Sequence, residues 1–492
     1  PDSTRGNTAT VPPKPKSSNP SFSERFEQFK EGASDEALYR LLYAMPKGGD
    51  IHHHMGGGYL PQRWFALATD PARNGGQRFY TRYRLTAPPT AFQSEWDTAH
   101  ELFFWMTLHE KAYHSLPKIV QTDFKPMDEL TEDEKAAWIS SVVLDRKNEG
   151  RDEFFEYTWA RLNHLLFNIH INTELLVENM QTFGAEGVRY LELMTFYDLW
   201  RDENNAILPA DRAKSIWQRR LAQPDAVATG VKVRFKAVIL RFADDAIEVT
   251  QRHFAYVNDN RDLWAGIDMA GREDDNRGFP GRFTEVFDAM LRKYPKIPIS
   301  IHAGEAEKPD SHIFDTLRLG ASRIGHGINL IQDPTTFQSM RHGRFLIEIN
   351  LISNHLLGYV PDTSQHPFPI YFRQGIPCCL NTDDRGMWDS NMTDEYLVAV
   401  KNFNLSWAEL CQLSRNSLTH AFLDDTEKQT LLNDFEAALA RFEQSINLDQ
   451  AELLDATTYG YGRRYLGLNQ LASPVPTKGA MPIVRGHSEA NE

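Results

Sequence analysis

The sequence His52-His53-His54 near the start of the chain could bind a divalent metal ion. Alternate side chains of a β-strand point to the same side, so in a strand His52 and His54 would share one face and His53 would face the other. Neutral imidazole is a common zinc ligand, and such a pair supplies two of the three or four ligands that a catalytic site needs. Three consecutive histidines also occur in solvated loops or as the remnant of a tag, so the metal interpretation depends on further ligands at other strand ends.

Further candidate ligands follow short apolar runs later in the chain. These runs end in Asp-Met-Ala-Gly (268–271), Ile-His-Ala-Gly-Glu (301–305), Arg-Ile-Gly-His-Gly (323–327) and Asn-Thr-Asp-Asp (381–384). With the first pair, His302 and Asp383 would make a ligand set for one divalent ion that leaves a position for water. Glu305, His326 and Asp384 remain as acid and base groups beside it. A metal ion lowers the pKa of water toward neutrality, so this combination indicates hydrolysis.

Each of these motifs is weak when taken alone. An Asp-Asp pair at a strand end, for example, could simply cap a helix. Their joint occurrence in this order, each on a predicted strand end, favours the functional interpretation.

The elements that must position these groups are eight short apolar runs with strand character, alternating with helical patterns. The runs begin with 49–54 and continue with 188–194, 233–242, 264–271, 297–305, 322–327, 345–351 and 377–384. Eight such strands over roughly 340 residues predict an α/β fold of the (β/α)8 TIM-type barrel class. In such barrels the active site lies at the carboxyl ends of the strands, which is where the candidate residues fall.

Around the barrel we expect four further parts. Residues 1–20 have the composition of a disordered leader, and 21–45 carry the periodicity of an N-terminal helical extension. The barrel itself spans 46–448 and includes an insertion, 60–150, that we predict to be largely helical and to act as a lid. Residues 449–492 form a C-terminal segment with a flexible tail.

Composition excludes several classes of partner. Hydrophobic residues make up 41% of the chain and the formal net charge is −14, which is typical of a soluble globular protein and argues against nucleic acid. No run of about 18 apolar residues is present, so no membrane is expected. Cys378, Cys379 and Cys411 are expected to be buried apolar residues. The leader could follow removal of a signal peptide or belong to a trimmed chain, and we favour export, periplasmic or secreted, over a cytoplasmic location.

Together, the motifs resemble those of the adenosine deaminase family of the metal-dependent amidohydrolase superfamily. The resemblance covers roughly residues 45–425, and Met45-Pro46-Lys47-Gly48, the leading helices and the insertion are closest in layout to the growth-factor-related adenosine deaminases. It implies one Zn²⁺ per chain and hydrolytic deamination of adenosine or 2′-deoxyadenosine to inosine or 2′-deoxyinosine, with release of ammonia. A purine nucleoside is then the small-molecule partner, and the leading helices imply a homodimer by analogy. The implied zinc ligands are His52, His54, His302 and Asp383.

The resemblance also implies roles for the other groups. Glu305 would protonate N1 of the purine ring, and His326 would orient and deprotonate the attacking water. Asp384 would contact N7 and help to hold the hydroxide, and Gly271 would contact N3 through its backbone.

Two positions depart from the family pattern. Gly56 stands where an acidic residue usually contacts a sugar hydroxyl, and Arg385 follows the aspartates where proline is usual. Arg385 could favour an anionic or modified substrate, or it could serve as a charge partner. Adenine, or another 6-amino or N6-substituted purine, is therefore an alternative substrate. A catalytically silent binding or growth-factor-like protein is an alternative of another class. The run 264–271 lacks the lysine that bridges two metals in other members of the superfamily, which favours a mononuclear site.

Overall fold

The computed structural model describes residues 20–87, 103–274 and 278–473. Residues 1–19 of the expected leader, the expected tail from residue 474 onward and part of the insertion lie outside the described residues. Among the helices that are described, none combines the length and the apolar character needed to cross a bilayer.

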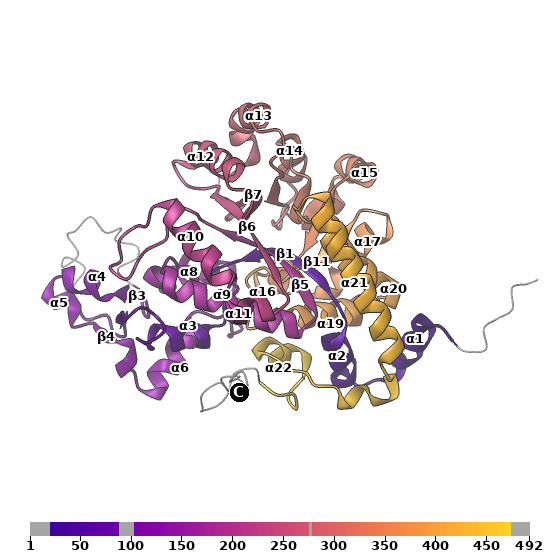
Figure 1. The fold of residues 1–492 in the computed structure, drawn as a ribbon, viewed down its shortest axis with the longest axis horizontal. Helices are drawn as coiled ribbons and strands as arrows, with labels where there is room; N and C mark the ends of the chain where they lie inside the picture. The colour runs from indigo at the N-terminus through magenta and orange to yellow at the C-terminus, as the bar shows by residue number, and fades with distance from the viewer. Residues whose placement is uncertain (1–19, 88–102, 275–277, 474–492) are drawn as a thin grey trace, which may run out of the picture.

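Eight parallel strands form the centre of the molecule, one in each predicted run (Figure 1). They make two four-stranded sheets with the orders β1-β5-β6-β7 and β11-β10-β9-β8. Two isolated parallel bridges join the edges of these sheets. Ile267 of β7 pairs with Ile299, just before β8, and His53 of β1 pairs with Asp383, just after β11, so the two sheets form a closed ring. The (β/α)8 prediction is confirmed. The strands are β1 (Gly48–His54), β5 (Val188–Thr195), β6 (Lys232–Leu240), β7 (Trp264–Ala270), β8 (Ser300–Ala303), β9 (Arg323–His326), β10 (Leu346–Ile349) and β11 (Cys378–Leu380).

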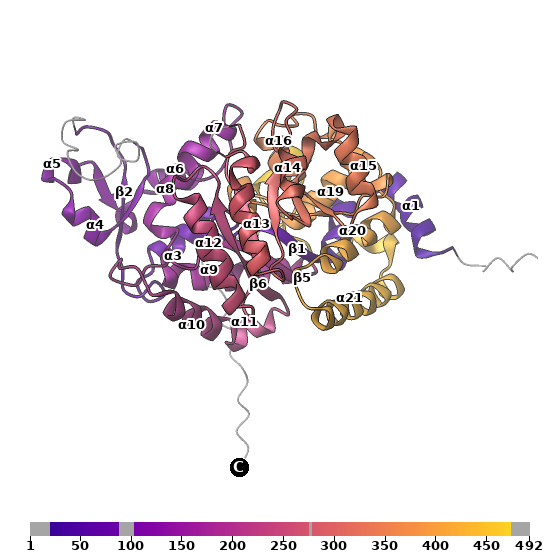
Figure 2. The same cartoon turned by 90° about the horizontal axis from the view of Figure 1, so that it is seen from above.

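Helices surround this ring and bury its outer face (Figure 2). Asp424, at the start of the longest helix, accepts a hydrogen bond from the Glu427 N–H, a typical N-cap. The helices after β5 are α10 (Ala210–Leu221), α11 (Pro224–Ala228), α12 (Ala246–Asp259), α13 (Thr284–Lys293), α14 (His312–Arg318), α15 (Pro334–His342), α16 (Leu351–Leu356), α17 (Phe368–Arg373), α18 (Arg385–Trp388), α19 (Met392–Phe403), α20 (Trp407–Thr419), α21 (Asp425–Ser445) and α22 (Gly460–Leu466), with 3₁₀ turns at Pro280–Phe283, Ile328–Gln332, Thr363–Gln365 and Leu448–Leu453. All three cysteines are buried and free, as predicted.

The N-terminal extension consists of α1 (Phe22–Gly32) and α2 (Asp35–Ala44). The Phe22 and Phe26 rings pack on Trp407 of α20 with centroid distances of 4.7 and 5.3 Å. The Tyr39 hydroxyl donates to the carbonyl of Thr457 at 2.8 Å. Both views place α1 beside the C-terminal helices, so the two ends of the described chain pack together.

The insertion contains a feature that we did not predict, a three-stranded antiparallel sheet of order β3-β2-β4. Its strands have only three or four residues, too few to show an alternating pattern. Tyr80, Leu108 and Phe124 form part of a small core of its own. The strands are β2 (Phe79–Arg82), β3 (Thr107–His109) and β4 (Phe124–Pro126), and the helices are α3 (Pro61–Ala68), α4 (Glu110–Ser115), α5 (Lys118–Gln121), a 3₁₀ turn at Met127–Glu129 and α6 (Glu132–Ser141).

Between the insertion and β5 lies an irregular helical stretch that ends in a long helix. It runs through α7 (Arg151–Glu153), a π-helical turn (Phe154–Thr158), α8 (Trp159–Leu162), a 3₁₀ turn (Asn163–Leu165) and α9 (Ile169–Ala185). The π-helical turn and α8 bring aromatic side chains to the carboxyl ends of the strands. π-Helical turns occur frequently at functional sites.

Candidate metal centre and active site

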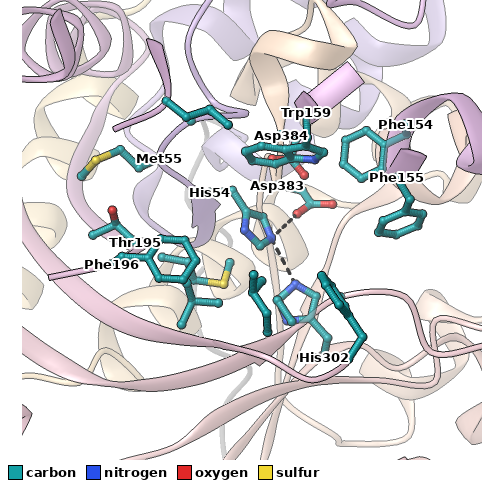
Figure 3. A pocket seen from close by; sticks show the side chains of 18 of the residues that line it. His54, Met55, Phe154, Phe155, Trp159, Thr195, Phe196, His302, Asp383 and Asp384 are labelled. Atoms are coloured by element: carbon teal, nitrogen blue, oxygen red, sulfur yellow. Dashed lines mark hydrogen bonds and ion pairs between the residues drawn. The ribbon is translucent and has the colours of Figure 1, made fainter. Parts of the chain in front are cut away.

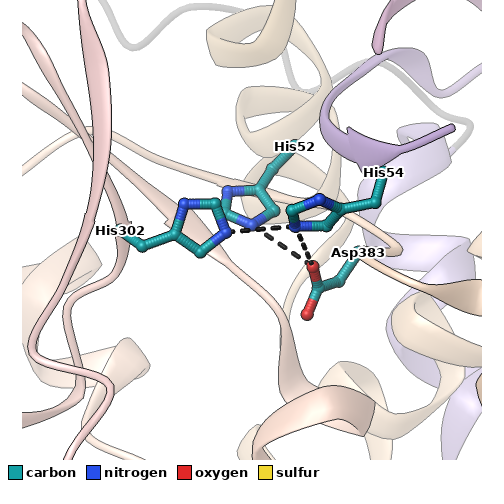
Figure 4. Close-up of side chains that lie close together, drawn as sticks. All are labelled: His52, His54, His302 and Asp383. Carbon is teal, nitrogen blue, oxygen red and sulfur yellow. Dashed lines mark hydrogen bonds and ion pairs between the residues drawn. The ribbon is translucent and has the colours of Figure 1, made fainter. Parts of the chain in front are cut away.

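Three imidazoles and one carboxylate converge at the carboxyl ends of the strands (Figure 4). His54 Nε2 lies 3.1 Å from His302 Nε2 and 3.2 Å from Asp383 Oδ1. His52 Nε2 lies 3.4 Å from the same carboxylate oxygen. The fold therefore brings together the four predicted ligands, which come from β1, β8 and the segment that follows β11. His53 points the other way, and its ring contacts Asn179 and Thr382 at 3.0 and 3.1 Å.

Two buried carboxylates orient the histidines from behind. His52 Nδ1 lies 2.6 Å from Glu348 Oε2, and His302 Nδ1 lies 2.9 Å from Asp268 Oδ1. A proton held on Nδ1 leaves each Nε2 lone pair free to face the centre, which is how proteins fix metal-binding histidines. Sequence reasoning assigned no role to Glu348 or Asp268. Their only signal was an acidic residue inside an otherwise apolar strand.

Both carboxylates are themselves neutralised by buried cations. Lys236 donates to Asp268 at 2.7 Å, and Arg323 pairs with Glu348 at 2.6 Å. Burial opposes ionisation of Glu348, but the charges of Lys236 and Arg323 and the hydrogen bond with His52 lower its pKa to about 2. The two orienting carboxylates are therefore ionised at neutral pH.

The convergence point has the properties of a cation site. His52 Nε2 and Asp383 Oδ1 are buried and have no hydrogen-bond partner among the described residues. Burial acts to lower the pKa of His52, but the neighbouring carboxylates of Asp383 and Glu348 raise it to about 10. This environment favours a positive charge at Nε2, and a divalent ion would satisfy both unpaired atoms. The donor set of three nitrogens and one oxygen fits zinc.

His326 stands beside this cluster at the end of β9. Its backbone has a φ of +65°, and Asp383 has +53°, so two non-glycine residues of the site adopt the left-handed region. Such strain costs on the order of 1–3 kcal/mol and is commonly found where side chains must be aimed precisely at a ligand. His326 Nε2 faces the cavity, 3.7 Å from Glu305 Oε1.

A chain of hydrogen bonds behind His326 fixes its tautomer. The Phe368 N–H donates to His366 Nδ1 at 3.1 Å, so neutral His366 carries its proton on Nε2, which contacts Asn354 Oδ1 at 3.1 Å. The Asn354 amide therefore directs its NH₂ group to His326 Nδ1, at 2.9 Å. Burial lowers the pKa of both histidines, so both are neutral. Neutral His326 then carries its proton on Nε2, toward the cavity.

Glu305 is held in place through its backbone. The Glu273 carboxylate accepts hydrogen bonds from the N–H groups of Gly304 and Glu305 at 3.0 and 2.9 Å, and it contacts His312 Nδ1 at 2.8 Å. Burial raises the pKa of Glu305 well above its ordinary value, and the charges of Asp383 and Glu273 raise it further. The surroundings of Glu305 therefore favour its protonated, neutral form.

Asp384 completes the polar end of the cavity. Its Oδ1 is buried without a hydrogen-bond partner among the described residues. Burial, followed by the charge of Asp383, raises its pKa well above the ordinary value. Position 57 must be glycine, because a Cβ there would lie 1.8 Å from Asp384 Oδ1. Gly271 lines the same cavity with a φ of +109°, which favours glycine.

These groups line one end of a cavity of about 310 Å³, at the lower limit of typical small-molecule sites (Figure 3). Figure 3 shows Phe154, Phe155 and Trp159 on one side and Met55 and Phe196 on the other. All the predicted site residues line the cavity except His52, which is fully buried.

Arg385 does not face this cavity. Its guanidinium pairs with Glu186 at 3.1 Å and lies 3.6 Å from the centre of the Phe183 ring. Of the two roles that the sequence left open, the structure favours the charge partner. This contact could not be read from the sequence because Glu186 lies 199 residues away.

Comparison with known proteins agrees with the fold. The model of the adenosine deaminase family matches residues 126–438. Adenosine deaminase of Pseudoalteromonas translucida is 30% identical over 259 residues, which cover 52% of this chain and 75% of that protein. Adenosine deaminase of Serratia proteamaculans is 38% identical over 178 residues, covering 35% and 51%. These alignments thus span between about half and three quarters of the relatives' lengths.

Solved structures show the same fold at lower identity. Adenine deaminase from Arthrobacter aurescens has a TM-score of 0.56 and 20% identity, over 80% of this chain and 99% of that one. The N6-mAMP deaminase of arabidopsis has a TM-score of 0.55 and 20% identity, over 80% and 99%. Together with the family match, these findings show that the chain belongs to the adenosine deaminase family and is an enzyme of the aminohydrolase type.

Proposed function

We propose that this enzyme uses one zinc ion to deaminate adenosine and 2′-deoxyadenosine hydrolytically, giving inosine and 2′-deoxyinosine and releasing ammonia. The observation that carries the proposal is the cluster of His52, His54, His302 and Asp383 at the end of a cavity that Glu305 also lines. When bound, zinc would supply the Lewis acidity that lowers the pKa of a water molecule toward neutrality.

Glu305 is the group that we assign to the purine ring. Burial raises the pKa of Glu305 and so favours its protonated form, and donating that proton to N1 would make C6 more electrophilic. Gly271 would contact N3 through its backbone.

His326 and Asp384 are assigned to the attacking water. The hydrogen-bond chain from Phe368 supports a proton on His326 Nε2, so we propose that His326 orients the water by donating a hydrogen bond. The resemblance implies that His326 takes up the water's proton, but a proton on Nε2 would prevent this. We therefore assign that step to Asp384, whose side chain lines the cavity and whose Oδ1 has no hydrogen-bond partner among the described residues.

One observation favours a second substrate class, namely adenine or an N6-substituted purine. Gly56 offers no carboxylate to a sugar hydroxyl, so recognition of the ribose at this position is missing. The silent binding protein gains no support, because all seven predicted metal-binding and proton-transfer side chains converge on one site.

The test is a substrate panel with zinc-replete protein. We expect the absorbance at about 265 nm to fall on incubation with adenosine or 2′-deoxyadenosine. We also expect a metal content of one zinc per chain, which Asp383→Asn should reduce. Zinc-loaded protein that leaves both nucleosides unchanged would refute the proposal, and turnover of adenine alone would establish the alternative.

A further inference from the structure

We propose that the cavity selects neutral 6-aminopurine nucleosides whose sugar carries an apolar 5′ group, as in 5′-deoxy- and 5′-alkylthioadenosines, over adenosine and over nucleotides. This inference rests on the proposed function and adds the chemical nature of the sugar. It follows from what lines the cavity away from the metal-binding end.

The first observation concerns the space beside Gly56. A Cβ at this position would lie 2.7 Å from Leu166 Cδ2 and 3.0 Å from Trp159 Cζ3. The place of a polar side chain is thus taken by two apolar groups from the stretch that precedes α9. A sugar hydroxyl that approaches Gly56 would meet hydrocarbon instead of a carboxylate.

Apolar side chains also line other parts of the cavity wall. The loop after β5 contributes Phe196, Leu199 and Trp200, and the indole N–H of Trp200 already donates to the carbonyl of Phe196 at 2.8 Å. Of the described residues that line the cavity, only Thr195 has a hydroxyl side chain. The purine C6 must face the metal-binding end, so the N9 sugar extends toward this apolar wall, and its 5′ arm reaches furthest.

Within the described part of the chain, the cavity wall offers no cation to bind a phosphate group. None of the described residues that line the cavity is Lys or Arg. Arg272, next to the lining residue Gly271, pairs with Asp274 at 2.5 Å and with Asp152 at 2.8 Å. Its charge is therefore already balanced, and a phosphate would be buried against apolar side chains without a counterion.

These contacts set the expected size of the preference. An apolar pocket rejects an added hydroxyl only moderately, so kcat/KM for 5′-deoxyadenosine and 5′-methylthioadenosine should exceed that for adenosine by roughly 10- to 100-fold. AMP should react at least about 100-fold more slowly than adenosine, because a buried anion costs far more than a hydroxyl.

The experiment measures kcat/KM for these four compounds with the zinc-replete full chain. Binding of the products 5′-deoxyinosine and inosine, followed by quenching of tryptophan fluorescence, gives the same comparison without turnover. Leu199→Gln, at a half-buried wall position, should reduce the preference for the 5′-deoxy compounds at least threefold in both assays. Ile207→Gln, at an exposed apolar position, should leave the preference unchanged.

The outcomes separate the two proposals. Turnover of adenosine with a kcat/KM equal to or above that of 5′-deoxyadenosine, or efficient turnover of AMP, would overturn this inference and leave the proposed function standing. Failure of every nucleoside to react would overturn both. A preference that persists unchanged in Leu199→Gln would also contradict the assignment to the apolar wall.

Discussion

Replacing Asn354 by Asp tests the idea that a chain of hydrogen bonds sets the tautomer of His326. In the native protein the Asn354 NH₂ group donates to His326 Nδ1 at 2.9 Å. A carboxylate of the same shape can only accept, so His326 must place a proton on Nδ1 and lose the neutral Nε2–H form. His366 can still donate to the other carboxylate oxygen, which keeps the packing.

The expected loss follows from what His326 contributes through Nε2. Positioned proton donors and acceptors contribute about 10²- to 10⁴-fold to rate. We therefore expect kcat of Asn354→Asp to fall by at least about 100-fold, equivalent to about 3 kcal/mol of transition-state stabilisation. KM should change much less, because Asn354 lies behind His326 and does not line the cavity.

The assay combines kinetics with a spectroscopic measurement. Long-range ¹H–¹⁵N correlation spectra of histidine-labelled protein should show His326 as the Nε2–H tautomer in the native enzyme and with a proton on Nδ1 in the variant. Asn433→Asp, at an exposed position that accepts a hydrogen bond from Gln429, is the matched control. Native kcat in a folded, zinc-loaded Asn354→Asp enzyme, or an Nδ1–H tautomer in the native protein, would refute the reasoning.

Three further predictions concern single side chains. Glu305→Gln cannot donate a proton, so kcat/KM should fall at least about 100-fold while zinc content stays native; retained activity would exclude Glu305 as the acid. Glu273→Gln removes a charge that raises the pKa of Glu305. Activity needs protonated Glu305 and is lost above its pKa, so the basic limb of the pH–rate profile should move to lower pH, and an unmoved limb would contradict this coupling. Arg385→Met leaves buried Glu186 without its partner and should cost about 3–5 kcal/mol of unfolding free energy in urea titrations, with unchanged substrate preference. A changed preference would return Arg385 to the substrate site.

The barrel could be predicted because most residues of its strands are buried, on both faces of strands such as β7 and β8, so most of these strands appear as short apolar runs. The candidate ligands could be found because they stand where those runs end. Glu348 and Asp268 lie inside such runs, and a sequence does not say which histidine a buried carboxylate will meet.

Other parts of the site depend on contacts between distant segments. Asn354 and His366 act on His326 only because α16 and the segment after it bring them into contact with the end of β9. The apolar wall beside Gly56 forms because Trp159 and Leu166, more than 100 residues later in the chain, occupy the space of a missing side chain. Periodicity reports the face that a residue presents and carries no information on such pairings.

The pairing of His53 with Asp383 also has a consequence for how the protein folds. It joins the first strand to the last, and the nearby hydrogen bond from the Ile51 N–H to Asn381 spans 330 residues of sequence. Contacts between such distant segments form slowly, because a long loop must close before they add stability. The metal ligands therefore come together only when the first and last strands pair. A bound ion would link these strands, and its binding energy would stabilise the closed barrel as a whole.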